Sequence, residues 1–292
     1  MPFRFKLLAL LVVLLWALNM IVIKLGVAAF PPILMSALRF VLVAALVVPF
    51  TRIRRDQWKG VVLVSFTFGT LHFGVLFLAL ERAEAGTSAI LIQLGAPIAT
   101  VLACLVLKER LGRLRLLGLA ISIAGIALLA AGPTMPSPMP FTLLVISATA
   151  WAVTNLIIKS IPGVSPMAMM GWSSLLAIPQ LLAASWLLEG ERWFTANYAS
   201  PFGWLAVVYS AIGSSIIAYG AWYWLLQRYP INAVVPFSML NPLLTVLLGI
   251  VLIGDVPSPV KIAGALVMLV GVALILRRPA GKLAAPTLPD TA

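Results

Sequence analysis

The sequence contains little of what a soluble enzyme needs. Of its 292 residues only 10% are charged, eight are acidic, one is a histidine and one is a cysteine. A soluble globular domain usually has about 25% charged residues. This chain is instead 62% hydrophobic, with a mean hydropathy of +1.11. These shortages exclude a soluble globule, and the sequence predicts a polytopic membrane protein.

The shortage of cysteine and histidine also limits the chemistry. A lone Cys104 excludes an intrachain disulfide and a cysteine-based metal site, and in its apolar run it is interpreted as a small packing residue. A lone His72 has no second histidine with which to build a metal or catalytic set within the membrane. The sequence also lacks HExxH, GxSxG and P-loop motifs. We therefore expect no enzyme activity, no metal and no cofactor.

Acidic residues are absent from the interior of the long apolar runs. All eight fall at predicted helix ends, in loops or in the C-terminal tail, so no carboxylate is expected at depth to relay protons or sodium ions. The formal net charge is nevertheless +12. Basic residues at the cytoplasmic ends of membrane helices account for such an excess. The sequence has no basic stripe with interleaved aromatics, so we expect no nucleic-acid binding.

Long apolar runs are what the sequence does contain. A membrane-spanning helix needs about 20 apolar residues. Breaks at proline, glycine and charge clusters predict ten such helices, at residues 5–29, 32–51, 60–80, 86–107, 114–131, 140–160, 167–188, 203–225, 232–253 and 259–276. The first run is no cleavable signal, because it continues to Lys24 without a small-residue cleavage site. The tail at 279–292, rich in Pro and Ala, is expected to be disordered.

The basic residues predict the orientation. With both termini in the cytoplasm, four of the 20 Lys and Arg residues fall outside, namely Lys24, Arg82, Arg192 and Lys261. Arg39 falls within a helix, which leaves 20 − 4 − 1 = 15 inside. This strong bias predicts N-in and C-in.

The chain also contains an internal repeat. Trp16 to Lys24 recurs as Trp151 to Lys159 at a shift of 135, and Gly118 and Gly125 recur as Gly264 and Gly271 at a shift of 146. Two halves of five helices follow, at about 5–131 and 140–276. Because five is odd, the second half enters the membrane from the opposite side. Such inverted repeats are typical of secondary transporters.

Four stretches together indicate a family. They are Leu10 to Asn19 with its continuation to Lys24, the pair Pro31-Pro32, Leu38-Arg39-Phe40, and Lys108-Glu109-Arg110-Leu111-Gly112. With the doubled five-helix plan, the chain resembles the drug/metabolite transporter superfamily, in its ten-helix EamA branch, over residues 5–277. The resemblance implies inner helices around a central cavity, with the fifth and tenth helices at the periphery. It also implies similarity to bacterial exporters of amino acids and related metabolites.

Polar and aromatic side chains far from helix ends are expected to face a protein interior or a water-filled cavity. The predicted substrate-binding residues are Trp16, Asn19, His72, Gln93, Trp151, Asn155, Ser215, Tyr219, Ser238 and Asn241. Alternatively, the Trp residues belong to the interfacial belt, and the Asn residues form hydrogen bonds to neighbouring helices. The alternative for His72 is a neutral imidazole bonded to an adjacent helix.

Five further residues are candidates for hinges or gates. Pro97 and Pro242 free the carbonyl groups four residues back, and the resulting kinks are hinges or packing features. Arg39 either extends toward the outer surface or attracts a substrate carboxylate. Glu109 and Asp255 close two helices on opposite sides of the membrane and are expected to form ion pairs with nearby basic residues.

The sequence thus predicts an exporter of amino acids or related small metabolites in the bacterial inner membrane, working by alternating access with broad specificity. The lack of a buried carboxylate favours facilitated transport over obligatory proton antiport. Its partners are small-molecule substrates and the lipid bilayer, and a monomer is compatible with the sequence. Two alternatives stay open, a carrier of nucleotide sugars or lipid precursors and a non-transporting membrane scaffold. Anionic phosphates would favour more basic residues within the helices than Arg39 alone.

Overall fold

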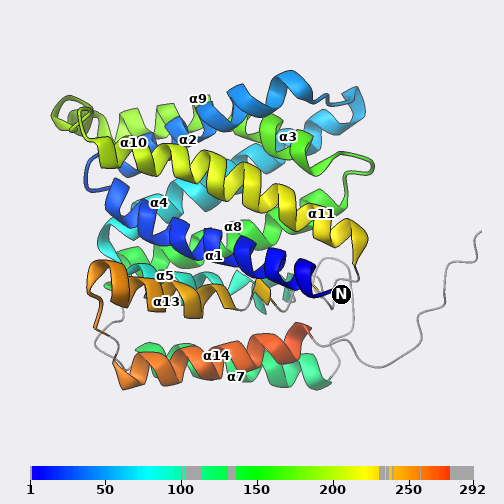
Figure 1. Ribbon diagram of the computed structural model, residues 1–292, viewed down its shortest axis with the longest axis vertical. Coiled ribbons are helices and arrows are strands. Elements are labelled where there is room, and N and C mark those ends of the chain that lie inside the picture. Colours follow the sequence, from blue (N-terminus) through cyan, green and yellow to red (C-terminus); the bar gives the residue numbers. More distant parts are fainter. Residues whose placement is uncertain are drawn as a thin grey trace, which may run out of the picture.

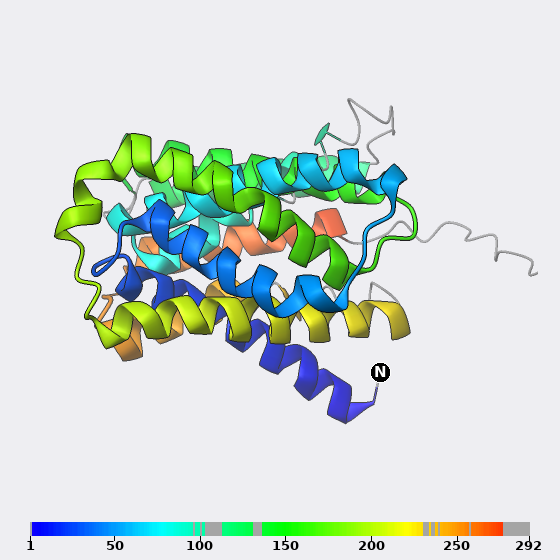
Figure 2. The ribbon, with the colours of Figure 1, turned by 90° about the horizontal axis from the view of Figure 1, so that it is seen from above.

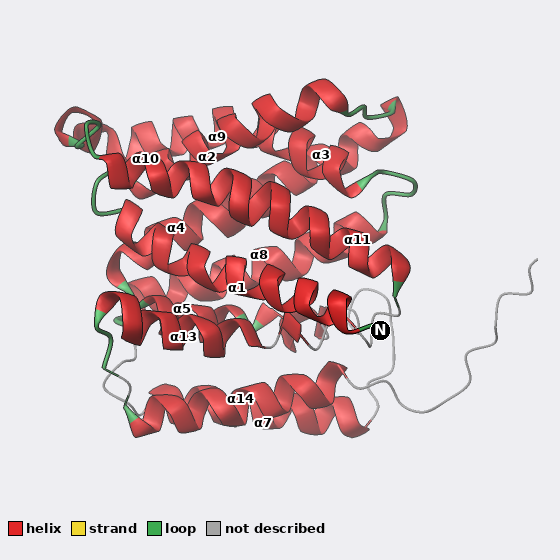
Figure 3. Ribbon diagram, in the orientation of Figure 1, coloured by secondary structure: helices red, strands yellow, loops and turns green. Residues whose placement is uncertain are grey.

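The computed structural model describes residues 2–95, 97–99, 101–102, 113–130, 136–229, 234, 237–238, 240–256 and 258–276. Cys104, Glu109 and the tail at 279–292 lie outside these residues. Within them all regular structure is helical (Figure 3). The predicted fold class, an all-helical polytopic membrane protein, is confirmed.

The first half contains five apolar helices. Its elements are α1 (Phe3–Gly26), α2 (Pro32–Val47), η1 (Val48–Phe50), η2 (Arg55–Gln57), α3 (Trp58–Val64), η3 (Ser65–Gly74), α4 (Val75–Arg82), α5 (Ala85–Ile92) and α7 (Arg113–Ala130). The elements α3, η3 and α4 follow one another without a break and form one long helix. This helix occupies the third predicted membrane segment.

The second half repeats this plan. Its elements are α8 (Pro138–Lys159), α9 (Pro166–Thr195), α10 (Pro201–Val208), η4 (Tyr209–Tyr219), α11 (Gly220–Arg228), α13 (Leu240–Ile253) and α14 (Pro259–Leu276). Again α10, η4 and α11 form one continuous helix. Several helices of both halves begin with proline in their first turn, including α2, α8, α9 and α10. Proline is favoured there because its missing N–H would have no partner in any case.

The lengths of these helices suit a membrane. Six described helices are long and apolar enough to cross it, and four shorter apolar helices begin at Ala85, Leu116, Leu240 and Pro259. Together they occupy the ten predicted positions. The seventh segment differs from the prediction of 167–188 followed by a polar loop, because α9 continues to Thr195. The helix can continue because Glu189 finds backbone partners in α2.

The connections gather at two ends of the molecule. Figure 1 shows those that follow α1, α4, α9 and α13 at the left end, whereas the N-terminus and the connections after α2 and α8 lie at the right end. Figure 2 gives the same separation from a second direction. The left end contains the connections predicted to lie outside the cell. The arrangement therefore agrees with the predicted alternation of the connections between the two sides of the membrane.

Two π-helical segments occupy matching places in the two halves. η3 has 10 residues and η4 has 11, and each is the middle of the third long helix of its half. A π-helical turn is rare and is frequent at functional sites. The two segments are therefore candidates for the core of the functional site.

The helices α7 and α14 pack on each other at one side of the molecule (Figures 1 and 3). They are the fifth helices of their halves, and the family resemblance implies this peripheral position. The helices α1, α2, α8 and α9 contact η3 or η4 directly.

Candidate functional site

The segment η4 is tied to the first two helices of the chain by buried hydrogen bonds. The Ser210 hydroxyl donates to Asn19 Oδ1 in α1 at 2.8 Å. The Ser215 hydroxyl accepts from Arg39 Nε and Nη2 in α2, at 3.1 and 2.8 Å. Ser215 in turn donates to the Ser210 carbonyl at 2.9 Å, five residues back. One continuous chain of hydrogen bonds thus connects α1, η4 and α2.

The segment η3 is tied to α8 and α9 in a similar way. His72 Nδ1 lies 2.9 Å from Ser147 Oγ and 3.0 Å from the Ser147 carbonyl oxygen in α8. The Thr154 hydroxyl donates to the Thr67 hydroxyl at 2.8 Å. In α9, Gln180 bonds two further hydroxyl groups of η3. A groove of about 270 Å³ between η3 and α8 includes Thr67 in its lining.

Each π-helical segment therefore contacts the first two helices of the other half. The repeat explains the match, because 154 − 19 = 135 is also the shift between Trp16 and Trp151. The counterpart of Asn19 is thus Thr154. Asn155, the residue predicted for substrate binding, is exposed, and its Nδ2 donates to the Trp151 carbonyl of its own helix at 2.8 Å.

Aromatic rings meet between the two segments. The Trp16 ring lies 4.9 Å from the Tyr219 ring and 5.1 Å from the Trp222 ring, measured between centroids. Phe68 of η3 stacks on His72 at 5.4 Å and lies 6.4 Å from Tyr219. The structure thus brings together five predicted site residues, Trp16, Asn19, His72, Ser215 and Tyr219. We call the group formed by these five residues with Arg39 and Phe68 the central cluster.

Arg39 lies inside the protein and does not extend to the membrane surface. The residue is 1% exposed, and its guanidinium carbon lies 4.0 Å from the centre of the Phe73 ring. The first of the two predictions for Arg39, extension toward the outer surface, is therefore wrong. Ser215 and the ring face of Phe73 give the cation contacts at depth, so its side chain has no need to reach the headgroups.

The other predicted binding residues belong to the fourth, sixth and ninth predicted helices. The Trp151 ring packs directly on the fourth helix, since a Cβ added to Gly95 would lie 2.7 Å from it. Asn241 is in the first turn of α13, where its carbonyl oxygen accepts from Thr245 Oγ1 at 2.9 Å. Gln93 and Ser238 are half-buried.

The two prolines differ in their effect on the backbone. α5 ends at Ile92, and Gln93 and Leu94 form a turn before the helix resumes ahead of Pro97. This interruption lies about four residues before the proline, where its ring removes a helical hydrogen bond. Pro242 lies in the first turn of α13, a position that tolerates a missing N–H. Pro242 therefore does not interrupt α13.

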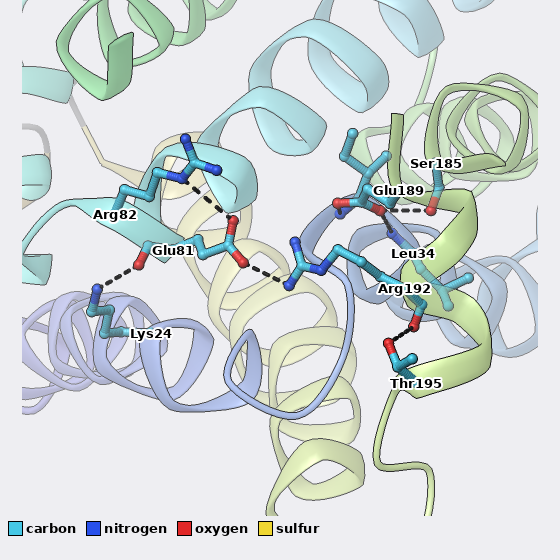
Figure 4. Close-up of polar contacts among 9 residues, drawn as sticks. Lys24, Leu34, Glu81, Arg82, Ser185, Glu189, Arg192 and Thr195 are labelled. Carbon is cyan, nitrogen blue, oxygen red and sulfur yellow. Dashed lines mark hydrogen bonds and ion pairs between the residues drawn. The ribbon is translucent and has the colours of Figure 1, made fainter. Parts of the chain in front are cut away.

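Ion pairs between the two halves join the outer end of the molecule. Arg192 Nη2 of α9 lies 2.6 Å from Glu81 Oε1 of α4, and Lys24 Nζ of α1 donates to the Glu81 carbonyl at 3.0 Å (Figure 4). Lys261 Nζ of α14 lies 2.5 Å from Glu84 Oε2, and the Lys261 side chain is 1% exposed. In this conformation the outer ends of the two halves are thus held together.

Among the described residues Asp255 forms no ion pair, although one was expected of it. Its backbone N–H donates to the Gly249 carbonyl at 3.0 Å, and its carboxylate packs on Gly249. The buried Oδ2 has no donor within hydrogen-bond distance in the described part of the chain. The reason is the turn at Gly254, whose φ of 72° folds Asp255 back over α13. Glu109 lies outside the described residues.

Glu189 stabilises the start of α2 and supports a prediction. Its carboxylate accepts from the backbone N–H groups of Ile33 and Leu34 at 2.9 and 3.2 Å, and from the Ser185 hydroxyl at 2.6 Å. Figure 4 shows this group beside the outer ion pairs. Glu189→Ala should lower the free energy of unfolding by about 1–3 kcal/mol, because buried donors lose a charged acceptor.

Equilibrium unfolding in mixed detergent and SDS micelles measures this effect, with Glu191→Ala as the control. Glu191 is an exposed acidic residue two positions further on in the same helix, so its replacement should change stability by less than about 0.5 kcal/mol. Equal losses of stability in the two variants would contradict the role of Glu189 in stabilising the start of α2.

Several residues of this site were missed by sequence reasoning. Ser147, Thr154, Ser210 and Gln180 bond to the π-helical segments, and Glu84 binds Lys261. Isolated Ser and Thr residues are common in membrane helices and carry no distinctive pattern. For Thr154 alone a signal existed, because it aligns with Asn19 in the internal repeat.

Comparison with known proteins agrees with this description. The EamA-like transporter family matches residues 5–131 and 139–277. A Salmonella typhimurium protein described as a "Probable amino-acid metabolite efflux pump" is 33% identical over 276 residues, covering 90% of this chain and 92% of that protein. A protein of the same description from Escherichia coli is 29% identical over 274 residues, covering 90% and 92%. One solved crystal structure has a TM-score of 0.64 at 21% identity, covering 94% of this chain and 97% of that chain.

The helical fold and these matches define a multi-pass membrane transporter. The chain belongs to the EamA-like transporter family. The resemblance seen in the sequence is thereby confirmed. Its place in a transporter family also agrees with the expectation that it is not an enzyme.

Proposed function

We propose that this transporter exports amino acids or closely related small metabolites across the bacterial inner membrane. The observation that carries the proposal is the central cluster, where aromatic rings surround hydroxyl groups and one cation. A small zwitterion with a variable side chain suits such surroundings, since rings accept apolar groups and polar side chains fix orientation. The descriptions of the Salmonella and Escherichia coli relatives point to the same class of substrate.

We propose alternating access as the mechanism. Because η3 and η4 each bond to helices of the other half, a rocking of one half against the other would move the walls of the central cluster. Opening the outer end requires separation of Glu81 from Arg192 and of Glu84 from Lys261. At the inner end, Gln57 Nε2 donates to the Pro162 carbonyl at 3.0 Å. Contacts between the halves thus exist at both ends, and a transport cycle would break them in turn.

Counterflow in proteoliposomes tests the substrate class. Vesicles loaded with unlabelled amino acid should accumulate labelled phenylalanine, threonine or cysteine, and should not accumulate a labelled nucleotide sugar. Protein-free vesicles and vesicles with the heat-denatured protein serve as controls. Absence of counterflow with all three amino acids would contradict the proposed function.

We also expect this counterflow to be independent of a proton gradient. Among the described acidic residues none lies in the central cluster, so no carboxylate is available there to carry a proton with each solute. Adding a protonophore, or imposing a difference of one pH unit across the vesicles, should change the initial rate less than about twofold. A strict requirement for the gradient would show instead that transport is coupled to protons, with His72 as the first residue to test.

A further inference from the structure

Arg39 carries a positive charge to the centre of the protein without a carboxylate to balance it. None of the described acidic residues forms an ion pair with it. Its Nε and Nη2 share the single Ser215 hydroxyl. The remaining Nη1 is buried and has no acceptor among the residues that the structure describes. A buried cation with an unused donor is costly unless a partner arrives.

A second unused donor belongs to Trp16 of α1. Trp16 Nε1 is also buried and has no acceptor in the described ranges. The Trp16 ring packs on Tyr219, and Arg39 bonds to Ser215, four residues earlier in η4. Two N–H groups without acceptors, from α1 and α2, therefore belong to side chains that contact the same stretch of η4, at Ser215 and Tyr219. A buried indole N–H usually has a hydrogen-bond partner. A buried indole N–H and a buried guanidinium N–H that both lack an acceptor therefore point to a missing ligand.

The chemistry of that ligand follows from the groups that lack partners. Both are donors and one is charged, so the ligand must supply an anionic acceptor. A planar carboxylate matches the fork of a guanidinium. The surrounding rings of Phe73, Trp222 and Tyr219 offer apolar walls. A phosphate dianion would call for more than one cation, and among the described residues the other buried Lys or Arg, Lys261, already pairs with Glu84.

The geometry points to a carboxylate-binding subsite formed by Arg39 and Trp16, which recognises the carboxylate of the transported solute. This inference deepens the proposed function and rests on it, because it assigns the α-carboxylate of an amino acid to a defined pair of donors. Arg39 is closed off in this conformation, being 1% exposed. The solute would reach it when the halves separate at one end.

Two probes of the same shape test the subsite on the full-length protein in detergent micelles. They are 3-phenylpropionate and its neutral amide, 3-phenylpropionamide. Binding is measured by tryptophan fluorescence and by the rise in unfolding temperature. The wild-type protein should bind the carboxylate roughly tenfold to a hundredfold more tightly than the amide, as expected for hydrogen bonds to a charged group.

Four variants separate recognition from folding. Arg39→Gln should remove the preference for the carboxylate, Arg39→Lys should retain part of it through the charge, and Trp16→Phe should weaken it while keeping the ring. Arg55→Gln changes an exposed arginine outside the cluster and should leave the preference unchanged. The unfolding temperature and gel-filtration profile without ligand are measured for each variant. If Arg39→Gln fails to fold, Arg39→Lys and Trp16→Phe still test the subsite.

Equal affinity of the wild-type protein for the two probes would overturn the subsite. So would an Arg39→Gln variant that loses stability but keeps the wild-type preference, because Arg39 would then only join α2 to η4. A carboxylate preference that depends on Arg39, found together with no amino-acid counterflow, would support the subsite and reject amino-acid export. In that case another carboxylate is the solute.

Discussion

Glu84→Gln is expected to lower the free energy of unfolding by about 1–3 kcal/mol, less than for a fully buried ion pair because the Glu84 side chain is 38% exposed. The Lys261 side chain is 1% exposed and its ammonium group lies against Glu84. After the substitution this cation stays buried with no carboxylate beside it. The pair also joins α14 to the start of α5, so the outer end should open more readily. Equilibrium unfolding in mixed micelles measures the first effect.

The double variant and an exposed pair provide the controls. Glu84→Gln with Lys261→Met removes both charges and should recover most of the loss, since an apolar side chain of similar size suits the buried position. Arg54 and Asp56 also form an ion pair, with side chains 58% and 61% exposed. Its hydrogen bond with Arg54 lowers the pKa of Asp56, yet Asp56→Asn should leave the stability almost unchanged because the pair is solvated. A double variant as unstable as Glu84→Gln alone would refute the argument.

The helices and their pairing in two halves could be predicted from the sequence because they depend on local properties. A run of about 20 apolar residues reports a membrane helix whatever its neighbours are, and proline marks its start. Helices such as α2 and α8 therefore begin within about two residues of the predicted positions. The end of α9 was misjudged for a non-local reason, since Glu189 is accommodated by backbone groups of α2, more than 150 residues away in sequence.

The central cluster could be predicted only in part, because it depends on which helices are neighbours. Trp16, Asn19 and His72 could be selected because they are conspicuous in apolar runs. That Arg39 meets Ser215, and His72 meets Ser147, follows from the crossing of the two halves. No spacing within one helix contains this information. The position of Arg39 was ambiguous for the same reason, since the burial of a cation depends on partners from a distant helix.

Gly125→Ala and Gly271→Ala should each lower the free energy of unfolding by about 1–3 kcal/mol, the cost of overpacking a close contact. A Cβ added at Gly125 would lie 2.7 Å from the Met268 Cα and would therefore clash with the backbone of that residue. A Cβ at Gly271 would clash with the backbone of Ser122. These two contacts are equivalent in the repeat, because 271 − 125 and 268 − 122 both equal 146. Both substitutions therefore push α7 and α14 apart by the same mechanism.

Gly190→Ala is the matched control for these variants, because Gly190 lies within α9 and a Cβ there would meet nothing within 4 Å. It should be neutral or stabilise the protein by up to about 1 kcal/mol through helix propensity. The double variant Gly125→Ala with Gly271→Ala should cost less than the sum of the single losses, since helices already separated at one glycine clash less at the other. Unfolding in mixed micelles measures all four variants. If Gly125→Ala and Gly271→Ala behave like Gly190→Ala, then close backbone packing does not hold α7 against α14, and contacts of their larger side chains must do so.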